Sequence, residues 1–442
     1  MRASSRALLL FACLLLASLL PWPGDAPRAQ GTLATWGLTY PGKRNLPIAI
    51  PRPKGGEGVA LDEFWSVVRR DLEISGWFKV LDPAAFVEPS SAGVRLGEFD
   101  FADWKVPGAA VLAKTVVTAT SGTGSARAEA WVYDVAGGAR LDARAFTGQP
   151  ERIRTLAHRV SNAIIEAVTG ERGIFDTRFA AVNARSGNKE IYIVDVDGHG
   201  AVQITRNGSI NLAPAWSPDG GSLVYTSYRA GNPDLYVTDL SNTKTRRVSA
   251  RMGLNTGGTW SPFQRVLAVT LSFNGNSDIY TVNADSGEQI ARLTNAPGID
   301  TSAAFSPDGA QIAFVSERSG GAQIYVMPAA GGEARRVTFH GSHNTDPAWS
   351  PDGTKLAYVS RDGNFDVFTC GLDGRGVIRI TQGQGDNEDP SWSPNGQYVA
   401  FSSTRTGTGQ IWISTADGYH HVQVTQDKGG WSNPTWSPSL TW

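Results

Sequence analysis

The sequence predicts a two-domain protein, in which a small N-terminal α/β domain precedes a C-terminal six-bladed, all-β propeller. A motif that recurs every 43 to 45 residues after residue 175 predicts the propeller. The composition agrees, because 50 glycines and 14 tryptophans suit many short strands, tight turns and aromatic packing between sheets. We expect a signal peptide over residues 1–29, the α/β domain over 30–172 and the propeller over 173–442.

The first thirty residues have the organisation of a secretory signal peptide. Arg2 and Arg6 provide a positive start, an apolar run follows over residues 7–20, and Pro21 and Pro23 end it. The run is shorter than the roughly 20 residues that a membrane-spanning helix needs. We therefore expect an exported protein, with cleavage somewhere over residues 26–31.

The two cysteines carry little information about the redox environment. Cys13 lies within the apolar run, which continues past it, whereas a lipid-anchored signal should end at its cysteine. Cys370 has strand-like neighbours and no second cysteine to pair with in the mature chain. We expect it to be a buried, unreactive thiol.

Residues 31–172 lack the repeat and predict a mixed α/β domain. Apolar residues at helical spacing predict helices over 61–74 and 151–168, with Gly76 and Gly170 just beyond them. Alternating and β-branched segments predict strands over 46–50, 77–81, 109–119, 128–135 and 140–146. We expect loops over 82–100 and 120–127.

The clearest part of the repeat is an aromatic residue followed by Ser-Pro. Proline fixes φ at the second position of a type I turn, and in most repeats a glycine closes that turn. The aromatic residue ends one strand, and the apolar run after the turn forms a second strand. The aromatic residues are Trp216, Trp260, Phe305, Trp349, Trp392 and Trp436.

Two further motifs keep the same spacing and predict two more strands in each repeat. One is an apolar-aromatic pair such as Ile191-Tyr192, and the other is a short run closing on Ser or Thr, such as Ile204-Thr205. Four antiparallel strands in about 44 residues make one propeller blade. Acidic residues just before several third strands, namely Asp234, Asp278 and Asp366, are expected to close turns.

The two ends of the repeat region predict how the ring closes. The first repeat lacks the aromatic-Ser-Pro strand, and the last such strand has no repeat after it. We expect residues 435–438 and 177–184 to be the first and second strands of one shared blade, which gives six blades and no exposed sheet edge. The aromatic rings should pack between neighbouring blades, each contributing at most about 4–6 kcal/mol.

Propeller geometry indicates where a partner would bind. The loops from the fourth strand of one blade to the first strand of the next crowd around the channel mouth, and here they are short, polar and held by rigid strands. Alternatively, their Asn and Asp side chains cap turns through their own backbone. The predicted binding residues are Asn211, Leu212, Asn255, Thr256, Asp300, Thr301, His343, Asn344, Thr345, Asp346, Asp386, Asn387, Glu388, Asp389, Ser432 and Asn433.

The acidic members of this set raise the question of a bound cation. Carboxylate oxygens are preferred Ca²⁺ ligands. The carboxylates concerned are Asp300, Asp346, Asp386, Glu388 and Asp389, and no loop shows a dedicated metal-binding spacing. We expect no metal and no cofactor, with Ca²⁺ near the channel as the alternative.

The sequence predicts no catalytic residues. It has no Gly-x-Ser-x-Gly motif and no phosphate-binding loop. His340 and His343 share a loop and His420 and His421 share a turn, so neither pair has the spacing of a zinc protease, and we expect solvated side chains. A net charge of −1 gives no basic face for nucleic acid. The alternatives to a binding protein are a propeller hydrolase or lactonase with its site in the channel, and a peptidase-associated substrate gate.

The whole mature chain resembles the TolB family, the periplasmic propeller component of the Tol–Pal system. Peptidase-associated propellers share the aromatic-Ser-Pro-Asp-Gly repeat, so the N-terminal half makes the resemblance more specific. Asp71-Leu72 with residues 75–82 resembles the family's helix-to-strand segment, and residues 156–173 resemble its linking helix. Residues 40–44 form an insert-like departure before the first strand.

The resemblance implies two partners and a location. The propeller face would bind the peptidoglycan-associated lipoprotein Pal, through which a monomeric periplasmic protein would associate with the outer membrane. The mature N-terminal segment would bind TolA, the inner-membrane partner. That segment comprises Gly31, Thr32, Leu33, Ala34, Thr35 and Trp36. Together these contacts would support outer-membrane integrity and envelope constriction during division.

Overall fold

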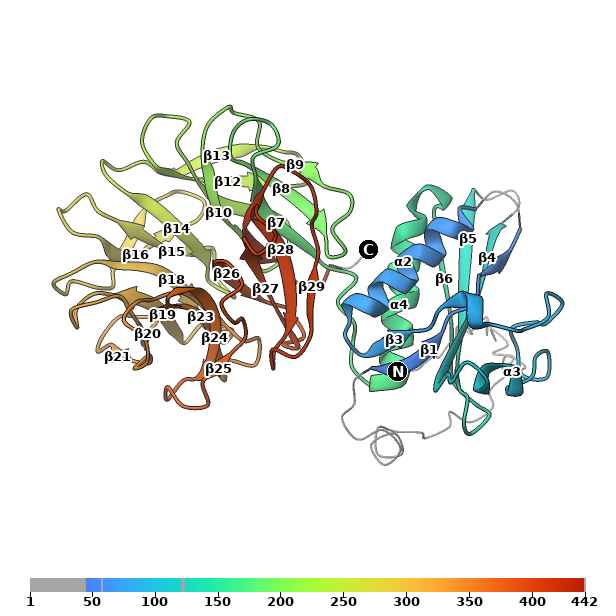
Figure 1. Ribbon diagram of the computed structural model, residues 1–442. Coiled ribbons are helices and arrows are strands. Elements are labelled where there is room, and N and C mark those ends of the chain that lie inside the picture. The colour runs from blue at the N-terminus through green and yellow to red at the C-terminus, as the bar shows by residue number, and fades with distance from the viewer. Residues whose placement is uncertain (1–44, 57–58, 121–123, 441–442) are drawn as a thin grey trace, which may run out of the picture.

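A computed structural model describes residues 45–56, 59–120 and 124–440 as two packed domains (Figure 1). The predicted signal peptide, the segment Gly31 to Trp36 and the insert-like residues 40–44 lie outside the described residues. Among the described residues, no helix is both long and apolar enough to cross a membrane.

The N-terminal domain is a mixed sheet with two helices on one face. The sheet order is β3-β1-β4-β5-β6, and β2 pairs with β4. Its strands are β1 (Leu46–Ala49), β2 (Lys54–Gly55), β3 (Phe78–Val80), β4 (Val111–Thr120), β5 (Ser125–Asp134) and β6 (Ala139–Gly148). Its helices are α2 (Leu61–Ile74), α3 (Ala102–Lys105) and α4 (Ile153–Thr169), with 3₁₀ turns at Pro83–Ala85 and Pro150–Arg152.

Both long helices were predicted from apolar spacing, and the structure explains where they end. Gly170 has a φ of 76° and its N–H donates to Glu166, which caps α4. Gly76, just after α2, has a φ of 66°, and a Cβ there would lie 2.7 Å from the ring of His420 in the propeller. A glycine is therefore required at residue 76 by its backbone conformation and by the approach of the second domain.

The propeller consists of six four-stranded antiparallel blades, as the repeat predicts. Written from the inner to the outer strand, the first three are β30-β7-β8-β9 (Trp431–Trp436, Arg178–Asn183, Glu190–Asp195, Val202–Gln203), β10-β11-β12-β13 (Asn211–Trp216, Ser222–Ser227, Asp234–Asp239, Thr245–Ser249) and β14-β15-β16-β17 (Asn255–Trp260, Val266–Leu271, Asp278–Asn283, Gln289–Arg292). The others are β18-β19-β20-β21 (Asp300–Phe305, Gln311–Ser316, Gln323–Pro328, Arg335–Arg336), β22-β23-β24-β25 (Asn344–Trp349, Lys355–Asp362, Asn364–Gly371, Ile378–Arg379) and β26-β27-β28-β29 (Asn387–Trp392, Tyr398–Ser403, Gln410–Thr415, His421–Gln423).

Ring closure follows the prediction, because the last strand joins the first blade. β30 pairs antiparallel with β7, with Trp436 opposite Phe179, and the Ser437 hydroxyl accepts from the N–H of Arg178. The aromatic residues pack between blades as predicted. The indole N–H of Trp260, for example, donates to the Ala215 carbonyl of the preceding blade. Equivalent interblade bonds come from Trp216, Trp349 and Trp392.

Each blade has two ends with different surroundings. The loop end carries the connections from strand two to three and from strand four to the next blade, and the turn end carries the two tight turns. The N-terminal domain packs on the turn end, where Tyr398 Oη donates to the Ser75 carbonyl and Arg70 donates to the Gln423 carbonyl. Helices α2 and α4 thus lie between the sheet and the propeller (Figure 1). The loop end stays clear of these contacts.

Candidate functional site

The predicted binding loops gather at the loop end and are tied to their neighbours. In each of five blades, the residue after the second strand donates its N–H to the residue before the inner strand. Examples are Tyr228 to the Ile210 carbonyl at 2.9 Å and Thr404 to the Asp386 carbonyl at 3.0 Å. The loops are therefore held by backbone bonds rather than left free, which suits a preformed binding face.

Five of the predicted binding residues are fully buried and position the loops. They are the first residues of inner strands, Asn211, Asn255, Asp300, Asn344 and Asn387, each with no exposed surface. Asn387 Nδ2, for example, donates to Asp366 Oδ1 and to the Gly385 carbonyl. The capping alternative describes the four asparagines, and Asp300 pairs with the Arg318 side chain. A side chain without exposed surface offers nothing to a docking partner.

The other predicted residues are accessible at the loop end. His343 is exposed and the remainder are half-buried. They are Leu212, Thr256, Thr301, Thr345, Asp346, Asp386, Glu388, Asp389, Ser432 and Asn433. Whether they contact a partner stays a prediction.

A ring of residues with left-handed backbone lines the channel near this end. The third residue of every inner strand has a φ between 49° and 65°, and the register with the second strand shifts there in every blade. Such bulges re-aim a side chain at the cost of backbone strain. The ring is Ala213, Gly257, Ser302, Asp346, Asp389 and Asn433, and it borders a channel cavity of about 490 Å³.

One half of the loop end is acidic. Asp389 accepts hydrogen bonds from the backbone N–H and the side chain of Asn433 at 3.0 and 2.7 Å, which joins two blades. Burial inside the channel, together with the Asp389 carboxylate, raises the pKa of Asp346 to about 7. Burial and the neighbouring carboxylates Asp389 and Asp386 also raise the pKa of Glu388. A positive charge from a partner would relieve this repulsion.

The other half of the loop end is apolar, which the sequence reading missed. Ile210, Leu254 and Ile299 stand directly before three successive inner strands, and each exposes 38–45% of its surface. Met252, which is 88% exposed, lies in the same loop as Leu254, and Tyr228 and Phe273 lie in loops between second and third strands at the same end. The repeat did indicate this difference. The residue before the inner strand is Ile, Leu or Ile in these three blades, but it is His343 and Asp386 in the next two.

The carboxylates considered for Ca²⁺ do not all converge. Asp300 is buried and paired with Arg318, whose Nη2 lies 3.1 Å from Asp300 Oδ2. Asp346 and Asp389 border the cavity, while Asp300, Asp386 and Glu388 are not among its lining residues. A cation at the channel would therefore meet two of the five predicted carboxylates.

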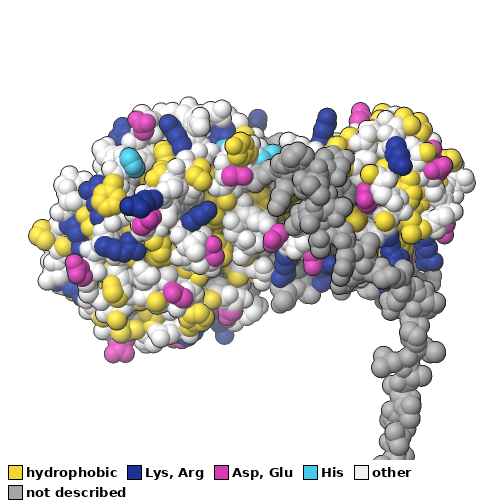
Figure 2. Space-filling model, turned by 90° about the horizontal axis from the view of Figure 1, so that it is seen from below, with side chains coloured by type: hydrophobic (Ala, Val, Ile, Leu, Met, Phe, Trp, Pro, Cys, Tyr) yellow, Lys and Arg dark blue, Asp and Glu magenta, His cyan; other side chains and the backbone are white. Residues whose placement is uncertain are grey.

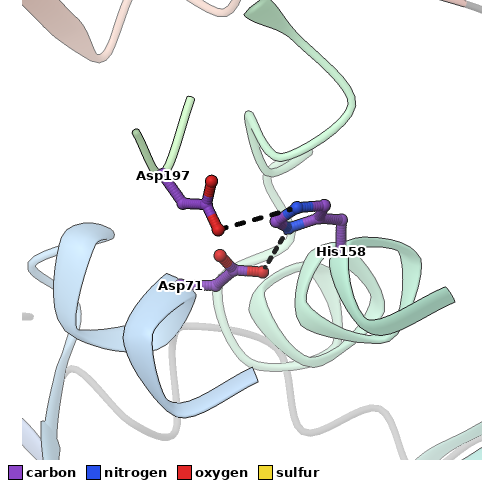
Figure 3. A group of neighbouring side chains, drawn as sticks. All are labelled: Asp71, His158 and Asp197. Carbon is purple, nitrogen blue, oxygen red and sulfur yellow. Dashed lines mark hydrogen bonds and ion pairs between the residues drawn. The ribbon is translucent and has the colours of Figure 1, made fainter. Parts of the chain in front are cut away.

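Three other titratable side chains do meet at metal-like separations, at the turn end. Asp71, His158 and Asp197 are buried, and one ligand atom of each lies within 4.8 Å of the others (Figure 3). The 2.8 Å separation of His158 Nδ1 and Asp71 Oδ2 is that of a direct hydrogen bond, and the Arg154 guanidinium already contacts Asp197. We therefore assign a charge network here rather than a metal centre.

The histidines predicted to be solvated are only partly so. His340 and His343 are exposed in their loop. The prediction is wrong for His420 and His421, which are both half-buried. His420 Nε2 lies 3.0 Å from the Glu73 carbonyl of the N-terminal domain, so the packed second domain covers part of His420, while Tyr419 beside it is 85% exposed.

On the propeller face seen in Figure 2, charged side chains of both signs are interspersed with hydrophobic ones, and Lys and Arg do not form one continuous patch. The net charge of −1 fits this distribution. Nucleic-acid binding would need a concentrated basic surface.

Comparisons with known proteins agree over both domains. A family described as the TolB beta propeller domain matches residues 165–440, and one described as the TolB amino-terminal domain matches residues 37–141. The Tol-Pal system protein TolB of Bordetella pertussis is 35% identical over 323 residues, which is 73% of this chain and 70% of the relative. That of Geobacter sulfurreducens is 42% identical over 190 residues, and the match spans 43% of its length.

A solved structure extends the likeness to the whole fold. The crystal structure of TolB from Acinetobacter baumannii has a TM-score of 0.80 and 29% sequence identity. The match covers 89% of this chain and 97% of that one.

Proposed function

Because this chain belongs to the TolB family of Tol-Pal system proteins, we propose that it is a non-catalytic periplasmic scaffold that links Pal and TolA. Pal would bind the loop end of the propeller and hold the monomeric protein at the outer membrane. TolA would bind the mature N-terminal segment. The linkage would maintain outer-membrane integrity and support envelope constriction during division.

The chemistry of the loop end carries the proposal. Rigid loops surround a channel there, with an apolar half and an acidic half, and the second domain leaves this end free. Protein interfaces combine an apolar centre with a polar rim in this way. Because the N-terminal domain sits at the turn end, the two partners would bind at separate places.

The same features favour a scaffold over the hydrolase and the substrate gate. Among the described residues, those lining the channel cavity are mostly Pro, Trp and small side chains, with two carboxylates and no histidine. General acid–base or nucleophilic catalysis needs convergent titratable groups. A substrate gate would in addition need a protease partner.

The Pal contact is tested by capture of purified Pal on variants of the loop end. Glu388→Lys in the acidic half and Met252→Asp in the apolar half should each weaken the Kd about tenfold or more. Their matched controls lie in turn-end turns, Glu333→Lys and Phe263→Asp, and should bind as the wild type does. Asp389 is a poor target, because its bonds to Asn433 join two blades and their loss would lower the melting temperature.

TolA capture supplies the reciprocal control. Deleting residues 31–36 should abolish TolA capture and leave Pal capture unchanged. Glu388→Lys should weaken Pal capture and leave TolA capture unchanged. Equal Pal capture by the loop-end variants and their controls would exclude this face. A hydrolase that co-purifies from periplasmic extract in place of Pal would favour the substrate gate.

We propose that neither contact requires a cofactor. Treatment with EDTA should leave Pal capture unchanged, and calorimetric titration with calcium chloride should show no binding heat. An ion at the channel ring would be supported instead if EDTA lowered Pal capture, if calcium restored that capture, and if Asp346→Asn prevented the restoration.

A further inference from the structure

Three buried, titratable side chains meet where the two domains touch. Asp71 comes from α2, His158 from α4 and Asp197 from the turn between β8 and β9 in the propeller (Figure 3). Their exposed fractions are 0%, 7% and 2%. His158 Nδ1 lies 2.8 Å from Asp71 Oδ2, and His158 Nε2 lies 3.8 Å from Asp197 Oδ2. One imidazole thus stands between a carboxylate of each domain.

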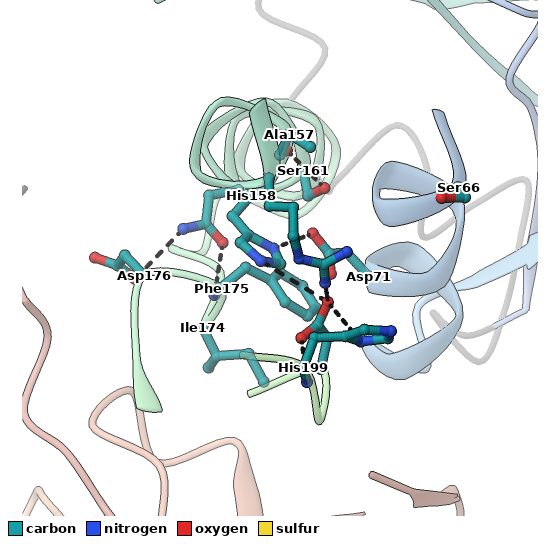
Figure 4. A network of polar contacts seen from close by, with 12 residues as sticks. Ser66, Asp71, Ala157, His158, Ser161, Ile174, Phe175, Asp176 and His199 are labelled. Atoms are coloured by element: carbon teal, nitrogen blue, oxygen red, sulfur yellow. Dashed lines mark hydrogen bonds and ion pairs between the residues drawn. The ribbon is translucent and has the colours of Figure 1, made fainter. Parts of the chain in front are cut away.

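A fourth side chain completes what we call the interdomain charge cluster, Asp71, Arg154, His158 and Asp197. Arg154 lies one helical turn before His158 on α4, contacts Asp197 and is 3.8 Å from Glu63 Oε1. The ring of Phe175 stacks on His158, with centroids 6.2 Å apart (Figure 4). Besides Asp197, the propeller turn supplies His199, whose Nδ1 lies 3.5 Å from Asp197 Oδ2.

With both carboxylates ionised, the charges in the cluster balance when His158 carries a proton. Two buried carboxylates face one guanidinium, so an imidazolium supplies the missing positive charge. Other charged groups near this site are paired elsewhere or are more exposed. Arg178 pairs with Asp195 and Arg172 pairs with Asp176. Glu63, Arg159 and His199 are more exposed than the cluster.

The electrostatic shifts agree with this balance. Burial alone would lower the pKa of His158, but the Asp71 and Asp197 carboxylates outweigh burial and raise it. Burial raises the pKa of Asp71 as well. Both shifts favour retention of protons in the packed state. Separation of the domains would take the propeller carboxylate Asp197 away from His158, whereas Asp71 belongs to the same domain as His158 and would stay beside it.

A single stretch of chain connects the two domains. The chain passes from α4 to the first propeller strand once, over residues 170–177, and Gly170 there has a left-handed φ of 76°. Packing leaves Asp71 Oδ1 and His158 Nε2 without hydrogen-bond partners. Buried polar atoms without partners carry a desolvation cost, which water would relieve on opening.

We propose that the interdomain charge cluster is a proton-dependent latch, which holds the N-terminal domain on the propeller when His158 is protonated and loosens when it is neutral. The sign follows from linkage. A histidine whose pKa is higher in the packed state than in the opened state stabilises the packed state at low pH, and this stabilisation is lost as the pH rises through the packed-state value. Within that window, each linked proton shifts the opening equilibrium by up to about tenfold per pH unit.

Distance measurement between spin labels in the full mature chain tests the latch. Val106 in the N-terminal domain and Met252 in the propeller are 76% and 88% exposed, and each is replaced by cysteine. Cys370, at 1% exposed, would stay unlabelled. At about pH 6 we expect one narrow distance distribution, and as the pH is raised further we expect a second, displaced population that grows.

Variants assign the effect to His158. His158→Gln cannot be protonated, so its distribution should not change with pH. The matched control His199→Gln removes a histidine that faces the same Asp197 oxygen from within the propeller, so it should behave as the wild type does. A distribution that stays constant with pH in the wild type, or that still shifts in His158→Gln, would overturn the proposal.

Two further measurements cover a folding defect and a bound metal. Should His158→Gln not fold, an NMR titration of the His158 ring in the wild type decides, and a midpoint at or below about 6.5 would reject the latch. EDTA should leave the distance distribution unchanged at every pH, and a shift on EDTA treatment would identify a metal site instead.

Discussion

Replacing Asp366 by alanine is expected to lower the free energy of unfolding of the propeller by about 3–5 kcal/mol. Asp366 has no exposed surface, and its Oδ1 accepts from Thr381 Oγ1 at 2.6 Å and from Asn387 Nδ2 at 3.0 Å. Its Oδ2 accepts from Arg379 Nη2 at 2.5 Å. Alanine would leave all three donors without this acceptor. Chemical denaturation followed by circular dichroism measures the loss.

A matched control separates burial from charge. Asp362 faces the same arginine, with Arg379 Nη1 and Asp362 Oδ2 3.9 Å apart, but its side chain is 80% exposed. Asp362→Ala should therefore cost less than about 1 kcal/mol. Equal losses from the two alanine variants would contradict the role given to Asp366.

The other blades offer a conservative replacement. Gln323 and Gln410 occupy the equivalent positions of two blades, and each accepts the corresponding threonine hydroxyl through Oε1, at 2.8 and 2.7 Å. Asp366→Gln should thus recover more than half of the stability that alanine loses. Stability no better than that of the alanine variant would show that the carboxylate charge is required.

These positions show what the sequence could and could not predict. Asp234, Asp278 and Asp366 were expected to close turns, and that expectation is wrong, because all three are fully buried and lie within the third strands of their blades. An acidic residue beside an apolar pair is normally solvated at a turn. Here the donors that permit its burial come from later in the chain, as Thr381 near the end of the same blade and Asn387 at the start of the next blade do for Asp366.

The propeller itself was predictable because each blade repeats the same local signals. Six copies of an aromatic-Ser-Pro turn at near-constant spacing determine strand number and register. The two incomplete ends then predict the shared blade that β30 and β7 form. Local signals are reliable when each is repeated and all agree with the global fold.

The candidate sites were only partly predictable, because exposure depends on contacts between distant segments. The loop positions followed from propeller geometry, but the burial of Asn211 and the exposure of Met252 did not follow from residue type. The interdomain charge cluster gave no sequence signal, since Asp71 and His158 are 87 residues apart and in different helices. Only domain packing brings Asp197 to them.

Replacing Trp349 by alanine is the second large loss that we expect, about 3–5 kcal/mol, because a buried ring between two blades leaves a cavity that the β-strands are too rigid to fill. The ring packs in one apolar cluster with Val315, Ile324 and Tyr358, so both blades lose contacts. Denaturant midpoints from circular dichroism measure the loss. Phe339→Ala is the control, because Phe339 is an aromatic residue in the loop before the same blade and is 62% exposed. It should cost less than about 1 kcal/mol.

The natural sequence provides the comparison that separates ring burial from the indole hydrogen bond. Phe305 replaces tryptophan in one blade, and there the Thr259 hydroxyl donates across the blade boundary to the Ala303 carbonyl at 2.8 Å. Trp349→Phe keeps most of the ring and loses only the 2.9 Å bond to the Ala304 carbonyl, so it should cost about 1 kcal/mol. If phenylalanine cost as much as alanine, the hydrogen bond rather than ring burial would hold these two blades together.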